Sequence, residues 1–415
     1  MATLLIVGLT LTLVLATALR LLNLRYTARH AERVPDGFEA SIDQVTLKNM
    51  SAYAHDTARM SIVSDVWFRS LLIGAVGLGG LPAYDSWIAG LSVSFVWQGT
   101  LYVLLLFWAI ALLSLPFEVY ENFVVEARHG FNHSTAKLFW LDFIKSKAIM
   151  TVLLAFIAVI GLNIVKWSGE HWWLLVWAFL FVFQLLITLI APKFIEPLFV
   201  KMTPLQSDEL QAKILALTNQ VGVRVDRIYQ VDASRRSGHT NAYFSGIGPV
   251  KRVVLFDTLL ARLTSEEIVA VLAHELGHWK HRHILKRMIV GQAMMLTACY
   301  GAGYLVRWEA LPSLVHAANA SFFLRLTIVM LLGSVLEFFT EPLMNLWSRT
   351  HEWQADAFAM RQVPHGDLQT ALVKLAKDNL ANLHVHPLYV AYHASHPTLP
   401  TRVAKLRDSV NASEH

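Results

Sequence analysis

Residues 264–278 read TSEEIVAVLAHELGH, and this stretch decides the fold of the segment around it. A threonine followed three residues later by a glutamate is a capping box, so a helix is expected to begin at Thr264. His274 and His278 lie four residues apart. Four residues turn a helix by about 400°, so both imidazoles leave one face. Glu275 is placed to take a proton from a water in the open coordination position of an ion held by the two histidines. The stretch therefore predicts a zinc site with Glu275 as the general base.

Histidines are frequent in this chain, so a chance motif is the alternative. With 18 histidines among 415 residues, a chance His-Glu-x-x-His occurs in roughly a few per cent of such chains. The capped helix around the motif favours the zinc site. The metzincin class of zinc proteases needs Gly at position 281 and His at position 284. This chain has His281 and Ile284, so that class is excluded. We expect His281 and His283 on the helix surface, with the helix reaching about His283.

A catalytic zinc needs a third protein ligand and an open position for water. Residues 348–357, SRTHEWQADA, form a polar helix directly after an apolar segment. Glu352 and Asp356 are four residues apart and share one face of this helix. Glu352 could bind the metal, and Asp356 could orient the ring of a ligand histidine. The alternative is a solvated charged turn at a membrane exit, and these residues alone leave both interpretations open.

The composition places the chain in a membrane. Hydrophobic residues make up 55% and charged residues 16% of the sequence, and the mean hydropathy is +0.45. Ordinary globular domains carry about 25% charged residues. The net charge of +5 is interpreted as membrane topology, because no basic cluster is interleaved with aromatic residues as nucleic-acid binding requires. The single cysteine, Cys299, excludes a disulfide within the chain and a cysteine-based metal site.

Seven apolar stretches are long enough, or nearly so, to cross a bilayer, which takes about 20 residues of helix. They are Leu4–Leu22, Val66–Ala89, Leu101–Phe117, Ala148–Val165, Trp172–Ile190, Met288–Leu305 and Phe323–Phe339. The first is expected to be a retained helix rather than a signal peptide, because no basic residue precedes it and it lacks a small-residue cleavage site. Loops rich and poor in Lys and Arg alternate along the chain. This alternation predicts an N-terminus outside, with the catalytic side and the C-terminus in the cytoplasm.

Between the fifth and sixth stretches the sequence predicts a small α+β unit. Ser207–Val221 has the pattern of an amphipathic helix. Arg227–Val231, Asn241–Ser245 and Arg252–Phe256 alternate like strands, and Gly246–Pro249 is a turn signal. The predicted fold class is therefore mainly α, with a short sheet beside the zinc helix.

These segments together resemble a known family, the type I CAAX prenyl endopeptidases, which are integral-membrane zinc proteases. The similarity covers nearly the whole chain. In the second half it rests on His239–Phe244, His274–Trp279, Ser348–Ala359, and Ser395-His396-Pro397 followed by Arg402. In the first half, Phe123–Glu126, Gly130-Phe131-Asn132 and Ile195–Phe199 are similar to family segments. A smaller relative, the heat-shock membrane protease HtpX, has fewer helices before its zinc motif than the five predicted here.

The resemblance implies a polytopic membrane protein whose seven transmembrane helices enclose a chamber, together with a gluzincin-like α+β peptidase domain. Residues 1–203 would form the N-terminal membrane domain with five helices. Residues 204–415 would form the zinc metallopeptidase domain, which includes the last two helices.

The resemblance also implies a role for each site residue. Glu352 becomes the third protein ligand of one zinc ion, and Asp356 becomes a partner of the ligands or a proton donor. His396 would stand near the oxyanion of the tetrahedral intermediate, although a capping or core histidine is the alternative. Arg402 would brace the ligand segment beside the substrate, with a surface salt bridge as the alternative.

A strand edge would bind the substrate, according to the same resemblance. Asn241, Ala242, Tyr243 and Phe244 would pair with an extended peptide through main-chain hydrogen bonds.

Three functions stay open at this point. The first is removal of the last three residues of a prenylated protein, and the second is quality control of unprenylated membrane chains. The third is not enzymatic: a membrane scaffold or a metal transporter. A transporter is expected to carry ionisable residues within its spans. Here the spans are almost free of them, and Glu337, close to the end of the seventh span, is the notable exception. A scaffold would be expected to lose Glu275.

The expected partners are a peptide or protein substrate, lipidated or not, and the lipid bilayer, without nucleic acid. We expect one zinc ion per chain and a monomer. The tail, residues 411–415, carries no retrieval signal, and a bacterial inner membrane is favoured over the endoplasmic reticulum.

Overall fold

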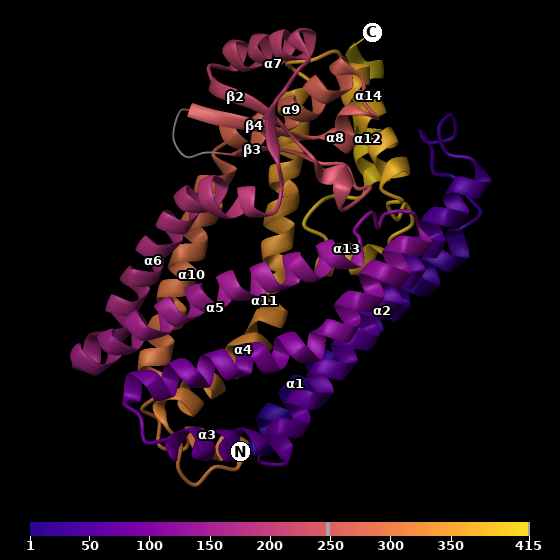
Figure 1. Cartoon of the computed structure of the whole chain (residues 1–415). Helices are drawn as coiled ribbons and strands as arrows, with labels where there is room; N and C mark the ends of the chain where they lie inside the picture. Colours follow the sequence, from indigo (N-terminus) through magenta and orange to yellow (C-terminus); the bar gives the residue numbers. More distant parts are fainter. Residues whose placement is uncertain (246–249, 414–415) are drawn as a thin grey trace.

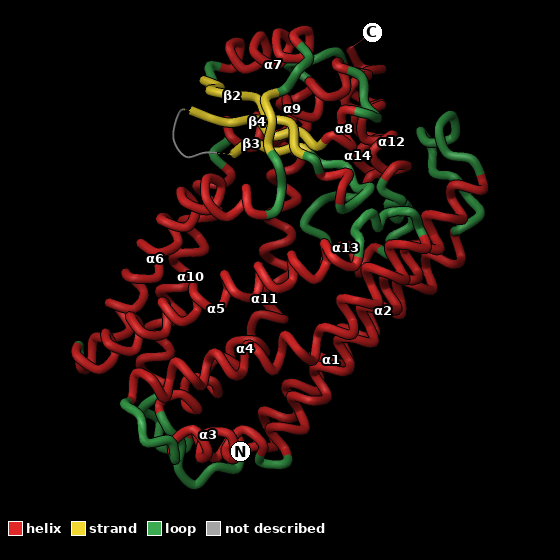
Figure 2. The backbone as a smooth tube through the Cα atoms, in the orientation of Figure 1, coloured by secondary structure: helices red, strands yellow, loops and turns green. Residues whose placement is uncertain are grey.

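The computed structural model describes residues 1–245 and 250–413. Long helices form one region, and a small sheet with shorter helices lies at one end of it (Figure 1, Figure 2). The N-terminus lies at the opposite end from the sheet (Figure 1). Within the described residues, seven helices are long and apolar enough to cross a membrane. The mainly α fold class and the number of spans are therefore confirmed.

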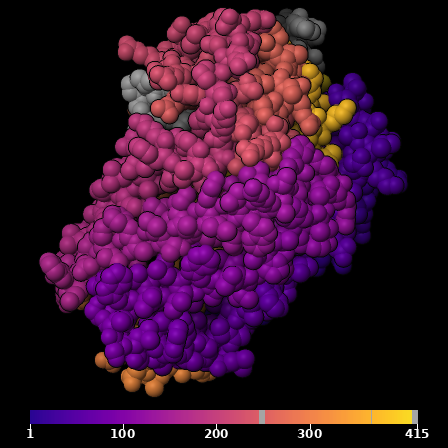
Figure 3. All heavy atoms as spheres, in the orientation of Figure 1, coloured from indigo at the N-terminus to yellow at the C-terminus, as the bar shows by residue number. Residues whose placement is uncertain are grey.

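The membrane-crossing segments are longer than the predicted apolar stretches. They are α1 (Ala2–His30), α2 (Gln44–Gly77), α4 (Phe95–Tyr120) with the π-helical η1 (Glu121–Glu126), α5 (Ala136–Trp167), η2 (Gly169–His171) and α6 (Trp172–Ile190) with η3 (Ala191–Ile195) and η4 (Glu196–Leu198), α10 (His283–Leu305) and α11 (Phe322–Ala359). On the face drawn in Figure 3, helices of the N-terminal half cover this region, and the orange segment between α10 and α11 emerges at the end opposite the sheet.

The bounds predicted for the second span, Val66–Ala89, are wrong. α2 begins already at Gln44 and ends at Gly77. Gly79 follows with a φ of 75°, a conformation that glycine adopts without the steric cost of a Cβ. It starts a separate short helix, α3 (Gly80–Ala89). Apolar content did not reveal this break, because both helices are apolar.

The seventh span and the third-ligand segment are one helix. The sequence predicted a span over Phe323–Phe339 and a polar helix directly following a span. The structure has a single helix, α11, from Phe322 to Ala359, which continues through Pro342. Glu352 is therefore carried directly on the extension of a membrane span.

A four-stranded mixed sheet lies beside the end of α11. Its strands are β1 (Met202–Pro204), β2 (Arg224–Val231), β3 (Ala242–Ser245) and β4 (Val250–Phe256), in the order β1-β2-β4-β3. β2 and β4 are parallel, and the other pairs are antiparallel. The three predicted strands are present, and β1 is additional. The predicted turn at Gly246–Pro249 lies outside the described residues.

The two faces of the sheet have different neighbours. On one face, Val253 packs with α7 (Asp208–Val221) and α9 (Ser265–Lys280) in the main core. On the other, Val254 packs with Met202 in a smaller cluster, because successive side chains on a strand point to opposite faces. The remaining elements are η5 (Ala233–Arg235), α8 (Asp257–Leu260), η6 (Leu311–Val315), α12 (His365–Asp378), α13 (Pro387–His393) and α14 (Leu399–Ser413).

Candidate metal centre

Three side chains from two helices converge beside the sheet. His274 and His278 project from α9, and Glu352 projects from α11, where it is 1% exposed. The Nε2 atoms of the two histidines are 3.2 Å apart. Oε2 of Glu352 lies 3.4 Å from Nε2 of His274, and Oε1 of Glu352 lies 3.3 Å from Nε2 of His278. The structure thus brings together the three predicted ligands.

The 3.2 Å between the two Nε2 atoms is close to the separation of neighbouring ligands on a tetrahedral metal ion, and all three donor groups lie within 4.8 Å of one another. Bonds of about 2.0–2.1 Å at tetrahedral angles put neighbouring ligand atoms about 3.3–3.4 Å apart. Oε2 of Glu352 is buried and has no hydrogen-bond partner among the described residues, which is costly for a carboxylate oxygen unless a cation lies beside it. Two imidazoles and one carboxylate are also a donor set found in catalytic zinc sites. The residues present therefore fit a zinc ion.

A buried ion pair lies behind His274. Its Nδ1 is 2.8 Å from Oδ1 of Asp356. Arg402 donates to both oxygens of that carboxylate, from Nη2 at 2.5 Å and from Nε at 2.9 Å. Arg402 is 7% and Asp356 3% exposed, so the surface salt bridge considered for Arg402 is wrong. Arg402 holds Asp356 against the ring of His274.

The charges around the site favour a bound cation. Burial disfavours the charged form of His274, but the carboxylates of Asp356 and Glu352 beside its ring outweigh the effect of burial and raise the pKa of His274 to about 9. Burial raises the pKa of Glu275, which makes this carboxylate a better proton acceptor than an exposed one.

A cavity of about 200 Å³ opens beside these groups. Its wall includes Glu275, Glu352, Asn241, Ala242 and His396. Nε2 of His396 lies 3.4 Å from Oε1 of Glu352, and its side chain is 62% exposed. His396 is therefore not a core histidine, and its ring can reach a molecule in the cavity.

Two of the four predicted strand residues do not turn their side chains to this cavity. The Tyr243 hydroxyl donates to the Glu196 carboxylate, and Phe244 packs against the main core. Asn241 and Ala242 do line the cavity. β3 is an edge strand of the described sheet, so only main-chain atoms of Tyr243 and Phe244 are available for pairing with a peptide.

Comparison with known proteins decides the family. Residues 23–201 match the family model described as CAAX prenyl protease N-terminal, five membrane helices, and residues 204–410 match the model of peptidase family M48. The chain belongs to the CAAX prenyl protease family of M48 peptidases.

Relatives and a solved structure agree over most of the chain. CAAX prenyl protease 1 of Saccharomyces cerevisiae is 34% identical over 411 residues, covering 92% of this chain and 90% of the yeast protein. The human CAAX prenyl protease 1 homolog is 30% identical over 425 residues, covering 90% and 88%. The crystal structure of S. mikatae Ste24p matches with a TM-score of 0.90 at 31% identity, covering 98% of both chains.

The M48 family assignment makes the protein a membrane metalloendopeptidase that hydrolyses peptide bonds. It overturns the non-enzymatic alternative of a scaffold or metal transporter, because the matched family is one of peptidases.

Close contact between α9 and α11 of this M48 peptidase depends on Gly277. A Cβ atom at this position would lie 2.8 Å from Cα and 3.0 Å from the carbonyl oxygen of Ala355. Ala355 and Ala359 are completely buried. Small residues on both helices let their backbones come into contact. This close packing places Glu352 next to the two histidines.

We expect Gly277→Ala to push α9 and α11 apart and to lower zinc content and peptidase activity at least tenfold. Overpacking costs about 1–3 kcal/mol, and a 1 Å misplacement of catalytic groups costs about a hundredfold in rate. Elemental analysis and a peptide cleavage assay measure both. Gly291→Ala in α10 is the control, since a Cβ there meets no atom within 4 Å. Equal zinc and activity in the two variants would contradict this role of Gly277.

The sequence placed His283 on the surface, and the structure corrects this. α9 ends at Lys280, and Arg282 adopts a φ of 56°, so the chain turns before α10 begins. This turn directs His283 inward, where it is 1% exposed. Its Nδ1 lies 3.0 Å from Nδ1 of His278. The sequence carried no signal for this contact, because a helix continued in register would leave His283 outside.

A second cluster that the sequence did not reveal anchors the segment before β3. His239 lies 3.0 Å from Glu126, which also accepts a hydrogen bond of 2.6 Å from the Tyr53 hydroxyl. Asn379, which follows α12 directly, accepts from the main-chain N–H of Thr240 at 3.0 Å. The second and third membrane segments and the end of α12 thus hold the start of the edge strand beside the metal centre.

Proposed function

We propose that this protein is a zinc-dependent CAAX-type endopeptidase that removes the last three residues of prenylated proteins. The observation that carries the proposal is the convergence of His274, His278 and Glu352, whose ligand atoms lie within 4.8 Å of one another at the end of a membrane span. A lipidated tail partitions into the bilayer, so its peptide end would reach a site at this level. The names of the yeast and human relatives support the same substrate class.

Each residue of the site has its own role in peptide hydrolysis. A zinc ion bound at this site would polarise the scissile carbonyl and acidify a water. Glu275 takes the proton from the attacking water and delivers it to the leaving amine. His396, exposed in the cavity, donates to the oxyanion. Asp356, neutralised by Arg402, keeps the ring of His274 in one orientation and tautomer.

We infer that β3 holds the substrate as an added strand. Its edge begins at Ala242, which lines the same cavity as Glu275, together with Asn241 just before the strand. Main-chain hydrogen bonds would align an extended peptide without demanding a particular side chain. This agrees with a peptidase that recognises a peptide end rather than a long sequence motif.

Cleavage of matched peptides tests the substrate class. A farnesylated C-terminal peptide and its unmodified twin are incubated with the purified protein, and the products are weighed by mass spectrometry. We expect cleavage three residues from the end, at least tenfold faster for the farnesylated peptide. Equal rates, or cleavage at internal bonds, would instead support a quality-control protease that acts on unprenylated chains.

We propose that His283 positions His278 for the metal. Nε2 of His283 donates to Oε1 of Gln354 at 2.8 Å, so Nδ1 of His283 is an acceptor. Nδ1 of His278 then carries the hydrogen and donates to it, and Nε2 of His278 is left with a free lone pair. This chain of donors selects the tautomer that can bind a metal.

We expect His283→Phe to weaken zinc binding about 10–100-fold, the usual effect of removing the partner of a ligand histidine. The phenyl ring retains the stacking on His351, whose ring centroid is 4.0 Å from that of His283. Competition with a chelator measures the affinity, independently of turnover. His281→Phe serves as the neighbouring control. An unchanged affinity in His283→Phe would exclude the positioning role.

The proposal extends to the domain boundaries and the membrane topology of the protein. We infer an N-terminal membrane domain over residues 1–203 and a peptidase domain over residues 204–415, with seven spans around a chamber. The alternation of Lys and Arg among the loops supports an outside N-terminus and a cytoplasmic catalytic side. A monomer and a bacterial inner membrane remain predictions, to be tested by mass measurement in detergent and by fractionation of the source cells.

A further inference from the structure

A second cavity, of about 660 Å³, lies beside the sheet, where α5 begins and α6 ends. We call it the basic cavity. Its 16 lining residues include six cations and one acid. The cations are Lys145, Lys193, Lys201, Arg235, Arg236 and Arg252. None of the lining residues also lines the cavity at the metal centre, so the basic cavity is a separate site.

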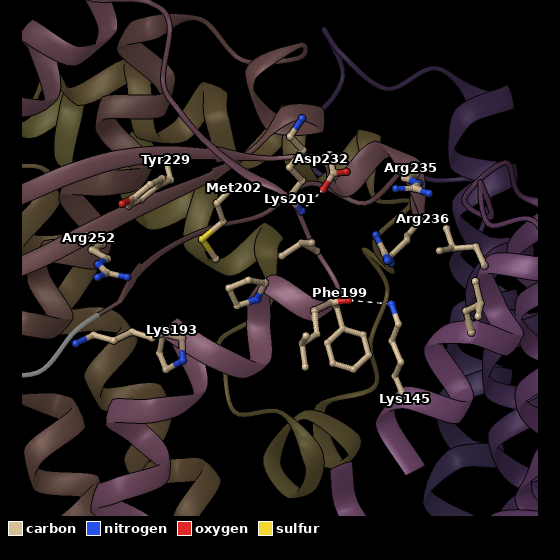
Figure 4. A pocket seen from close by; sticks show the side chains of 16 residues that line it. Lys145, Lys193, Phe199, Lys201, Met202, Tyr229, Asp232, Arg235, Arg236 and Arg252 are labelled. Atoms are coloured by element: carbon tan, nitrogen blue, oxygen red, sulfur yellow. Dashed lines mark hydrogen bonds between the residues drawn. The ribbon is translucent and has the colours of Figure 1, made fainter. Parts of the chain in front are cut away.

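Four stretches of the chain contribute these cations. Lys145 comes from α5, and Lys193 and Lys201 come from the segment between α6 and β1. Arg235 ends η5 and is followed by Arg236, whereas Arg252 lies on β4. Figure 4 shows Arg252 and Lys193 on one side of the cavity, and Arg236 and Lys145 on the opposite side. The positive charges therefore surround a hollow instead of following one solvated helix face.

Protein groups neutralise little of this charge. Arg236 forms an ion pair with Asp142, at 2.8 Å from Nε, while its Nη1 is buried without a hydrogen-bond partner among the described residues. The only acid in the wall, Asp232, accepts a hydrogen bond of 2.7 Å from the main-chain N–H of Lys201. Across residues 1–245 and 250–413, no carboxylate lies within ion-pair distance of the side chains of Lys193 or Arg235. A concave site with this surplus attracts an anion.

The other part of the wall is apolar and belongs to membrane spans. Leu141 on α5 and Leu198 in η4 line the cavity and are 45% and 50% exposed. Phe194, beside Lys193, is 68% exposed. Both α5 and the segment through η4 are long and apolar enough to cross a membrane. An anionic group inside the cavity would therefore lie beside the exposed apolar surface of two candidate membrane spans.

We propose that the basic cavity binds the phosphate headgroup of an anionic phospholipid, with its acyl chains along the exposed apolar surface of α5 and α6. Guanidinium and ammonium groups are the usual protein partners of phosphate oxygens. Basic pockets between spans at the membrane surface bind lipid headgroups in the same way. Because Arg252 lies on β4, the partner of β3, the bound lipid joins the sheet of the peptidase region to the membrane surface.

Titration of the purified protein in neutral detergent tests this site. The probes are dioctanoyl phosphatidic acid, dioctanoyl phosphatidylcholine and inorganic phosphate. We expect phosphatidic acid to bind at least tenfold more tightly than the other two. Inorganic phosphate binding as tightly as phosphatidic acid would overturn the lipid assignment in favour of a free phosphate. Phosphatidylcholine binding as tightly would show that the headgroup charge is irrelevant, and would also overturn it.

Charge-removing variants locate the binding. Lys193→Gln with Arg252→Gln is expected to weaken phosphatidic acid binding at least tenfold, while Lys193→Arg with Arg252→Lys retains it. Lys48→Gln with Lys137→Gln removes the same charge from exposed positions outside the cavity and should leave binding unchanged. Equal losses in this control pair would overturn the site. Should the cavity pair fail to fold, the exposed Lys193→Gln alone is expected to weaken binding at least threefold.

Discussion

Glu275→Gln is expected to keep the fold and the zinc ion and to lose roughly a thousandfold in kcat, within the range of about 10²–10⁴ for removal of a general base. The amide has nearly the shape of the carboxylate but cannot accept the proton of the attacking water. Glu275 lines the cavity without being one of the three converging ligands, so its loss leaves the metal centre intact. Peptide cleavage under saturating substrate measures kcat, and elemental analysis of the same sample measures zinc.

Glu266→Gln is the matched control for this variant. Glu266 lies in the first turn of the same helix, where it pairs with Lys213 at 2.5 Å on the exposed surface. We expect wild-type kcat from it, because its carboxylate is far from the cavity. Cleavage by Glu275→Gln at the wild-type rate, with zinc present, would remove Glu275 from the mechanism.

Glu352→Gln is expected to abolish stoichiometric zinc binding, with less than about 0.1 zinc per chain after dialysis and no measurable cleavage. A neutral amide is a poor zinc ligand compared with a carboxylate. Two histidines alone leave the ion with half of a tetrahedral set. The substitution keeps the volume of the side chain, so the packing of α9 on α11 through Gly277 is retained.

Circular dichroism and elemental analysis separate loss of zinc from loss of fold. Glu341→Gln, earlier on α11, is the control, and we expect full zinc occupancy from it. A Glu352→Gln protein that retains one tightly bound zinc and cleaves peptides would show that another group supplies the third ligand.

Local features of the metal centre were predictable from the sequence. Thr264 and Glu267 form the expected capping box, and the spacing of His274 and His278 puts their rings on one face. These features depend on hydrogen bonds and helix geometry between residues a few positions apart. The turn at Arg282 was missed, because nothing in the residues around it marks the end of α9. Its consequence, the burial of His283, was missed with it.

Contacts between segments far apart in the sequence could not be predicted from local sequence patterns alone. Glu352 follows His278 by 74 residues, and its own neighbours allowed either a metal ligand or a solvated turn. Only the family resemblance favoured the ligand. The basic cavity had no sequence signature at all, because its six cations come from four separate stretches between Lys145 and Arg252.

The sequence by itself determined a chain with seven apolar spans and a capped helix bearing two histidines and a glutamate, since hydropathy and helical periodicity are properties of neighbouring residues. The tertiary structure decided which surfaces meet. Gly277 against Ala355 sets the distance between two helices, and that distance brings Glu352 to His274 and His278 as a group that could hold a metal ion. How closely two helix backbones approach each other depends on how the helices pack. The sequence pattern along either helix alone does not predict that distance.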